Sequence, residues 1–197
     1  MKSTIKLAAL APALLLGGCL SFGGEAPDSL LTLTSTATVP AGAGAPMSQS
    51  NAIALVEFGS TKAIDVTRVP VQVTDTELAY LQDAVWVDRP ARLFGQLVAE
   101  TIRSRTGRMV VDGDDPGVGA IDRLHGTLRS FGYDARSRDV VVVFDAVRNG
   151  ASSNVTTRRF ESRVPVAAPE TAFVGPALNQ AANDVAGQIA DWVGQGA

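Results

Sequence analysis

The chain has 197 residues, of which 46% are hydrophobic, and a formal net charge of −3. This length and apolar content suit a single domain with a substantial core. The acidic balance argues against a general nucleic-acid binder, because such a protein presents a basic surface to the phosphates. The single cysteine excludes a disulfide within the chain, and together with the single histidine it leaves no His/Cys cluster for zinc.

The amino terminus combines a short positive region with an apolar run. Lys2 and Lys6 accompany the uncharged stretch 7–16. This stretch is typical of a secretory signal and is too short to span a bilayer, which takes roughly 20 apolar residues. It leads into Leu16-Gly17-Gly18-Cys19, which resembles the lipobox of bacterial lipoproteins. The resemblance implies cleavage between Gly18 and Cys19 and acylation of Cys19, palmitate included. An ordinary secretory signal with a cysteine near its end by chance is the alternative.

A lipidated Cys19 would hold the mature chain on a membrane with its folded part facing the periplasm. Two or more acyl chains give stable anchoring, whereas one gives marginal binding. Leu20 stands where inner-membrane lipoproteins often carry Asp, so we expect an outer-membrane location. Residues 19–28 are then a lipidated tether rich in Gly and Pro, and residues 29–197 form the domain. Removal of residues 1–18 takes away two lysines and lowers the formal net charge from −3 to −5.

Short β-type runs occupy the first part of the domain. The expected strands are 30–36, 52–58, 69–73 and 77–81. The segment 39–51 lacks periodicity and is expected to be a loop. Pro70 lies inside the third run and predicts an edge position or a strand start, because proline donates no ladder hydrogen bond.

A helix is predicted over Asp88–Arg105. Asp88 is expected to cap the free amides of the first turn, and Pro90 falls in that turn, where proline is tolerated. Apolar residues from Leu93 to Ile102 recur at spacings of one, three and four, which draws a single buried stripe. Arg103, Arg105 and Arg108 complement the carboxyl end of the helix dipole, and Gly107 is the expected stop.

Three long strands and a second helix complete the domain. The strands are expected over 124–133, 140–147 and 155–166, with turns near 135–138 and at Asn149-Gly150, a strong hairpin signal. The apolar period of 169–193 predicts the helix. The fold class is therefore α/β (α+β): one domain with a mixed, mostly antiparallel sheet, the three long strands at its centre, and two helices packed on one face.

No catalytic constellation is evident. His125 lies within a predicted strand, and the chain has no Gly-x-Ser-x-Gly elbow. An EF-hand loop opened by Asp112 would place its bidentate acid at position 123, which is Arg123. The glycines at 117–119 and the run 59–62 lack the order of nucleotide-binding loops. We therefore expect neither an enzyme nor a cofactor or metal site.

The segment 123–164 is rich in arginine. Its charges are either the solvated face of strands or a surface that meets anionic lipid or an acidic partner. On the second interpretation, such arginines and the edge implied by Pro70 would pair with acidic surfaces such as 112–115 and support a homo-oligomer. A monomer with scattered solvated charges is the alternative. The arginines considered are Arg136, Arg138, Arg158 and Arg159.

Several blocks of the chain together carry a family resemblance. The most specific is the block 80–90, with Tyr80-Leu81 followed by Trp86-Val87-Asp88-Arg89-Pro90; 53–56, 64–71, 124–131 and the helix ending in Trp192 also fit. The chain resembles the ABC-type transport auxiliary lipoprotein family, of the paraquat-inducible outer-membrane lipoprotein type associated with MCE lipid-transport systems. Gln82 after Leu81 departs from variants with a Tyr-Leu-Asp-Arg order.

The resemblance implies a non-enzymatic outer-membrane lipoprotein that assists an ABC/MCE-type intermembrane lipid transport system. Its partners would be an MCE-domain periplasmic protein and the ABC permease and ATPase. The alternative is a structural envelope-assembly lipoprotein that stabilises another periplasmic complex. Tyr80, Trp86, Asp88 and Arg89 are a candidate interaction motif. Alternatively, Trp86 fills the core, and Asp88 and Arg89 cap the helix or pair locally.

Overall fold

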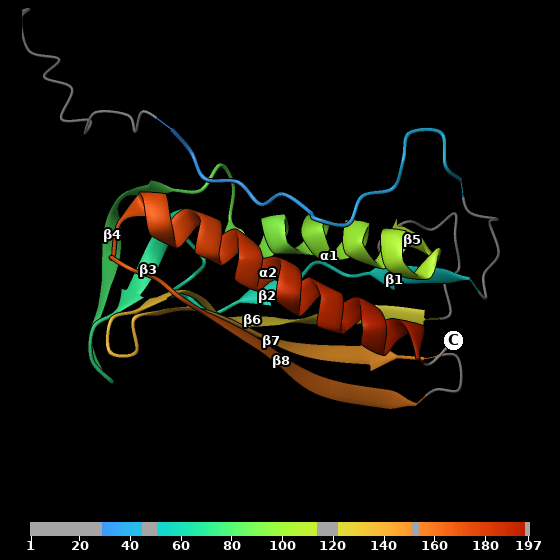
Figure 1. Cartoon of the computed structure of the whole chain (residues 1–197). Helices are drawn as coiled ribbons and strands as arrows, with labels where there is room; N and C mark the ends of the chain where they lie inside the picture. Colours follow the sequence, from blue (N-terminus) through green and yellow to red (C-terminus); the bar gives the residue numbers. More distant parts are fainter. Residues whose placement is uncertain (1–28, 45–50, 114–121, 151–153, 196–197) are drawn as a thin grey trace, which may run out of the picture.

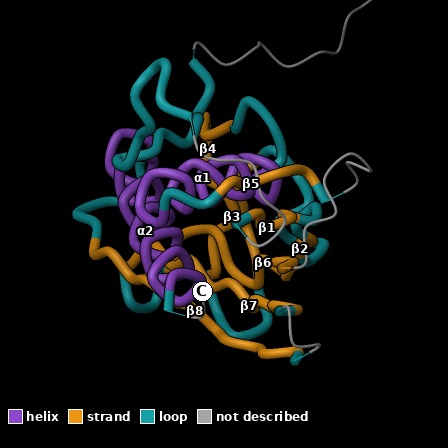
Figure 2. The backbone as a smooth tube through the Cα atoms, turned by 90° about the vertical axis from the view of Figure 1, so that its right-hand side faces the viewer, coloured by secondary structure: helices purple, strands orange, loops and turns teal. Residues whose placement is uncertain are grey.

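The computed structural model describes residues 29–44, 51–113, 122–150 and 154–195, so Cys19 and the tether lie outside the described residues. The described chain forms two layers, an eight-stranded mixed sheet and the helices α1 (Pro90–Thr106) and α2 (Thr171–Gly194). Both helices lie on the same face of the sheet (Figures 1 and 2). The predicted fold class is confirmed. In the described residues, neither helix has both the length and the apolar composition needed to cross a bilayer.

The long strand β6 organises the sheet. Its 13 residues pair antiparallel with β7 on one side, and on the other side they pair parallel with β1, β2 and β3 in turn. β5 then extends the sheet from β1, β4 extends it from β3, and β8 extends it from β7. The strands are β1 (Ala52–Leu55), β2 (Gly59–Ser60), β3 (Arg68–Gln72), β4 (Leu78–Val85), β5 (Met109–Asp112), β6 (Asp122–Asp134), β7 (Asp139–Asn149) and β8 (Val155–Pro165).

Three details of the predicted strands are wrong. The run 30–36 forms no strand beyond an isolated bridge between Leu31 and Trp86. Pro70 lies within β3, which has β4 on one side and β6 on the other, and it is tolerated beside a register shift in the β3–β4 ladder. Among the described strands β8 pairs with β7 alone, so the three-stranded meander is not wholly central.

The cap position of helix α1 lies one residue after the predicted cap. Arg89 occupies the cap position, and Asp88 accepts a hydrogen bond from the Arg89 amide at 2.7 Å rather than from an amide of the first turn. The capping role predicted for Asp88 is therefore wrong. Pro90 stands at the first helical position, and Gly107 ends the helix with a left-handed φ of 66°. Both of these predictions are confirmed.

The core lies between the helices and one face of the sheet. In β7, Val140, Val142 and Phe144 alternate toward the helices and are fully buried, as the two-residue period of a strand requires. Helix α2 presents small residues such as Ala181 and Ala182 at its buried face, and these let it pack closely against α1 and β8. One continuous apolar cluster therefore joins both layers.

We predict that Gly132→Ala lowers the stability of the domain. A Cβ atom at Gly132 would lie 2.3 Å from the Pro70 carbonyl oxygen, because β3 and β6 approach closely there. Forcing these strands apart should cost about 1–3 kcal/mol in the free energy of unfolding, measured by chemical denaturation. Gly59→Ala in β2 is the matched control, since its nearest neighbour would be 3.8 Å away. Equal stability of the two variants would contradict the prediction.

Candidate interaction site

Residues 30–39, which we call the strap, run extended across the helix layer (Figure 1). At its start the strap is joined to β4: the Leu31 amide donates to the Val85 carbonyl at 2.7 Å, and the Val87 amide donates to the Leu31 carbonyl at 2.9 Å. Exposed and half-buried residues then alternate along the strap. It therefore has the side-chain pattern of a strand while lying on helices.

Polar side chains of both helices hold the strap backbone. The Thr36 amide donates to Asn183 Oδ1 at 2.8 Å, and Asn183 Nδ2 donates to the Thr34 carbonyl at 2.9 Å. From α1, Glu100 accepts a hydrogen bond from the Val39 amide at 2.8 Å. Sequence reasoning missed these partners. The available signal was Asn183, a polar residue inside the buried stripe of α2.

The four residues of the predicted interaction motif do not share one exposed surface. Trp86 is 2% exposed and packs against Phe131 at a ring distance of 5.4 Å. Tyr80 lies beneath the Arg68 guanidinium, and Arg89 pairs with Asp65. Asp88 contacts Arg92 and the Arg89 amide. These positions match the interpretation of a core tryptophan with local pairing, and a partner contact through the motif stays a prediction.

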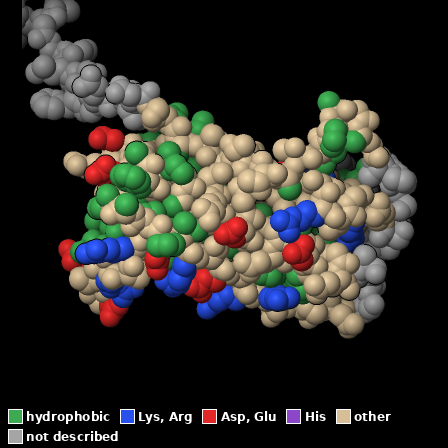
Figure 3. Space-filling model, viewed as in Figure 1, with side chains coloured by type: hydrophobic (Ala, Val, Ile, Leu, Met, Phe, Trp, Pro, Cys, Tyr) green, Lys and Arg blue, Asp and Glu red, His purple; other side chains and the backbone are tan. Residues whose placement is uncertain are grey.

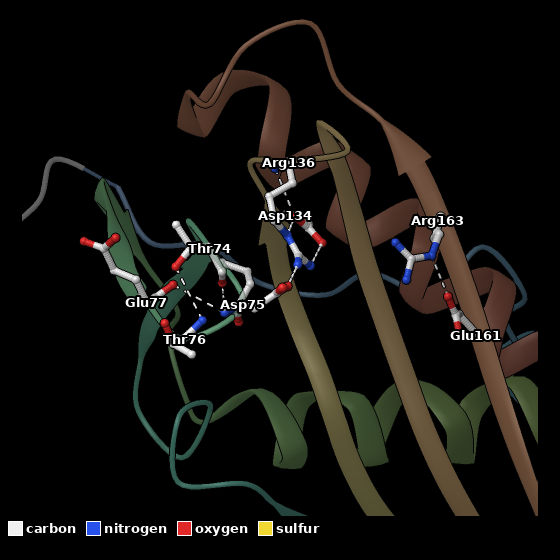
Figure 4. Close-up of polar contacts among 9 residues, drawn as sticks. Thr74, Asp75, Thr76, Glu77, Asp134, Arg136, Glu161 and Arg163 are labelled. Atoms are coloured by element: carbon white, nitrogen blue, oxygen red, sulfur yellow. Dashed lines mark hydrogen bonds and ion pairs between the residues drawn. The ribbon is translucent and has the colours of Figure 1, made fainter.

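A shallow groove of about 330 Å³ lies on the sheet face opposite the helices. Val141 and Val143 line it, because they alternate in β7 with the core residues that face the helices. Ion pairs form its rim. Arg136 donates to Asp134 and to Asp75 in the β3–β4 turn, while Arg163 pairs with Glu161 (Figure 4). The rim is therefore charge-balanced within the domain.

Three arginines of the predicted oligomer surface have partners within the domain. Arg136 and Arg159 engage Asp134 and Asp145 respectively, and Arg158 lies over the ring of Phe160 at 5.3 Å. Hydrogen bonds from Arg136 lower the pKa of Asp134 to about 2. The segment is thus mainly a face of intramolecular ion pairs, and blue and red side chains alternate over the lower strands in Figure 3.

We predict that Asp145 titrates at a pKa of about 2. Hydrogen bonds from Arg159 and then Arg129 lower this pKa from 3.8. Because the folded pKa is below the unfolded one, the ionised carboxylate stabilises the fold above about pH 4, and this contribution disappears as the pH falls toward 2. An NMR titration should show a higher pKa in Arg159→Gln. Asp134 should not move in that variant, and an unchanged Asp145 would contradict the prediction.

A buried ion cluster lies at the end of the sheet where β6 begins. Arg108 and Arg148 each approach Asp122 Oδ2 at 2.7 Å, and all three side chains are at most 10% exposed. Arg108 also donates to the Ala52 carbonyl, and Arg148 donates to the Trp192 carbonyl. The sequence predicted that Arg108 complements the carboxyl end of the α1 dipole. The structure shows that Arg108 instead contacts β1 through the Ala52 carbonyl and is linked to β6 and β7 through the Asp122 carboxylate.

His125 and the acidic stretch 112–117 are the remaining sequence candidates for chemistry. His125 lies in β6 opposite Val147 and is half-buried. In the ranges that the structure describes, no group of three or more His, Cys, Asp or Glu residues could hold a metal ion. Most of the acidic stretch 112–117 lies outside these ranges. The groove is a feature of the described residues that can engage another molecule.

Solved structures of other proteins share this fold. The crystal structure of protein XCC0632 from Xanthomonas campestris superposes with a TM-score of 0.69 at 19% identity, covering 84% of this chain and 94% of that one. An uncharacterized protein has a TM-score of 0.61 at 11% identity, covering 85% and 99%. These likenesses show a shared fold. No curated protein matches the sequence.

A family model described as the ABC-type transport auxiliary lipoprotein component matches residues 31–190. The matched region includes all eight strands, α1 and most of α2. The chain belongs to the ABC-type transport auxiliary lipoprotein family.

Proposed function

We propose that this protein is a non-enzymatic, lipid-anchored auxiliary of an ABC transport system of the MCE type, which moves lipid between membranes. The observation that carries the proposal is the family match, which covers the folded domain from the strap into α2. The lipobox ending at Cys19 stands ten residues before Ser29, where the described chain begins. In this proposal the lipid on Cys19 anchors the protein in the outer membrane, and the domain faces the periplasm.

The groove on the open sheet face supports a docking role. Its apolar floor is bordered by paired charges, which suits contact with a protein surface better than capture of a free anion. The strap already covers part of the helix layer, whereas the groove on the opposite sheet face is open to a partner. We place the MCE-domain protein on this face.

Mass spectrometry of the mature amino terminus tests the anchor. The expected product begins at Cys19 and carries acyl chains including palmitate. Cys19→Ser should leave the chain unprocessed or release it from the membrane fraction. An unmodified Cys19, or a Cys19→Ser protein that stays firmly on the outer membrane, would reject the anchor.

Co-purification from detergent-solubilised membranes tests the partner. The lipoprotein should recover an MCE-domain protein with its permease and ATPase. Leu78→Glu, at the exposed border of the groove, should reduce that recovery, while Val155→Glu at the far end of β8 should not. Equal recovery with both variants would remove the groove as the contact. Recovery of a different envelope complex instead would favour the envelope-assembly alternative.

Self-association is the second element of the proposal. A conduit for lipid needs a ring or a platform, and one domain of this size encloses no channel by itself. Light scattering of the lipoprotein in detergent, at low and high salt, should show an oligomer. A monomer at every concentration, with or without the MCE-domain protein, would leave an anchored single domain.

A further inference from the structure

We infer that one end of the domain rests directly on the lipid surface, with Leu30, Val87 and Phe173 inserted among the lipids. We call these three residues the apolar end. The inference rests on the proposed lipid anchor and adds an orientation to it. The domain would stand on the bilayer with the first turn of α2 toward the lipid and the last turn away from it.

The first support is exposure. Leu30, Val87 and Phe173 are 51%, 55% and 46% exposed, and they make up most of the large apolar side chains that the described residues leave open to solvent. Figure 3 shows hydrophobic side chains gathered over the end where β4 and the start of α2 lie. A contiguous exposed apolar patch of this kind marks a site of interaction with a protein or a membrane.

The second support is the way the backbone positions these side chains. Leu31 and Trp86 form a parallel bridge and turn their side chains inward, Trp86 into the core. Successive side chains along extended backbone point to opposite faces, so Leu30 and Val87 point outward together. Thr171 Oγ1 donates to the Gln82 carbonyl at 3.2 Å, which holds the start of α2 against β4. Leu31 also packs against Gly175, so the turn that carries Phe173 lies beside the bridge.

The third support is the length of the tether. Residues 19–28 can span at most about 35 Å, the contour length of ten residues. They join the domain at Ser29, next to the apolar end. The 24 residues of α2 extend away from this end by about 36 Å. An anchored Cys19 therefore keeps the apolar end near the bilayer and leaves the far end of α2 in the periplasm.

The charges at this end provide no net attraction to anionic lipid. Asp83 and Glu170 are exposed there, and both would be repelled by anionic lipid. The neighbouring cations are paired, Arg89 with Asp65 at 3.3 Å and Arg92 with Asp88 at 3.4 Å. Contact with the bilayer should therefore depend on apolar burial and change little with salt.

A single-thiol experiment tests this orientation. Cys19 is the only cysteine and its thiol is consumed by lipidation, so Phe173→Cys introduces the one reactive thiol of the mature lipoprotein. The thiol is labelled with an environment-sensitive NBD fluorophore, and the protein is reconstituted in vesicles of phosphatidylethanolamine and phosphatidylglycerol. Val155→Cys, 63% exposed at the opposite end of β8 from the residues that lead into α2, is the matched control. Val87→Cys is the independent second position.

Labels at positions 173 and 87 should show blue-shifted emission and several-fold stronger quenching by spin-labelled acyl chains than the label at 155. This difference should persist at high salt. Equal quenching at all three positions, in protein whose Cys19 is shown by mass spectrometry to be lipidated, would overturn the orientation and leave the anchor standing. A difference that vanishes at high salt would overturn apolar insertion. An unlipidated Cys19 would overturn both the anchor and the orientation.

Discussion

Replacing Asp122 with alanine is expected to destabilise the folded protein by about 3–5 kcal/mol, because two buried guanidinium groups then lose their shared carboxylate. Burial acts to raise the pKa of Asp122, but the hydrogen bonds and charges of Arg148 and Arg108 outweigh it and lower the pKa below 3.8. The carboxylate therefore stays ionised at pH values above this lowered pKa. Its stabilising contribution is complete above the unfolded pKa and is lost as the pH falls through the lowered folded pKa.

Chemical denaturation of Asp122→Ala beside Asp191→Ala measures this effect. Asp191 pairs with Arg105 at 3.2 Å at the same end of the molecule, but its side chain is 61% exposed. An exposed pair of this kind contributes at most about 1 kcal/mol. Similar stability of the two variants would contradict the buried cluster. A triple replacement of Arg108, Asp122 and Arg148 with apolar residues should recover much of the loss, since no unpaired charge then remains buried.

Replacing Leu178 with aspartate is expected to cost about 4 kcal/mol or more, enough to unfold a domain of ordinary stability. Leu178 is fully buried in the face of α2 that packs on the sheet. The apolar residues around it offer no partner for a carboxylate. Burial of an unpaired charge is therefore added to the loss of apolar contact. Leu178→Ala, which removes only the contact, should cost about 2–5 kcal/mol.

Gln180→Asp is the matched control in the same helix, because Gln180 is exposed. Its free energy of unfolding should stay within about 0.5 kcal/mol of the wild type. Thermal melting of the three variants ranks them. A Leu178→Asp protein that melts with the Gln180→Asp control would mean that α2 does not pack on the sheet as the structure shows.

Local features of the sequence determined most elements of this fold. Pro90 and Gly107 mark the two ends of α1 because their backbone preferences act within one turn. The period of apolar residues located α2. Alternation located β6 and β8, and a short apolar run located β7. The lipobox ending at Cys19 is likewise a contiguous motif, and the sequence is the whole basis for predicting the anchor.

Tertiary structure decided which surfaces these elements meet. The alternation in residues 30–39 indicates that one side is buried, but it does not say by what, and the strap lies on helices rather than on a strand. The parallel order of β1, β2 and β3 along β6 joins residues far apart in the chain, and such pairing has no local signature. Arg108 follows a helix end, yet it is buried because Asp122 and the Ala52 carbonyl converge on it from two strands. Short-range preferences therefore determined where elements begin and end, whereas long-range packing decided their partners.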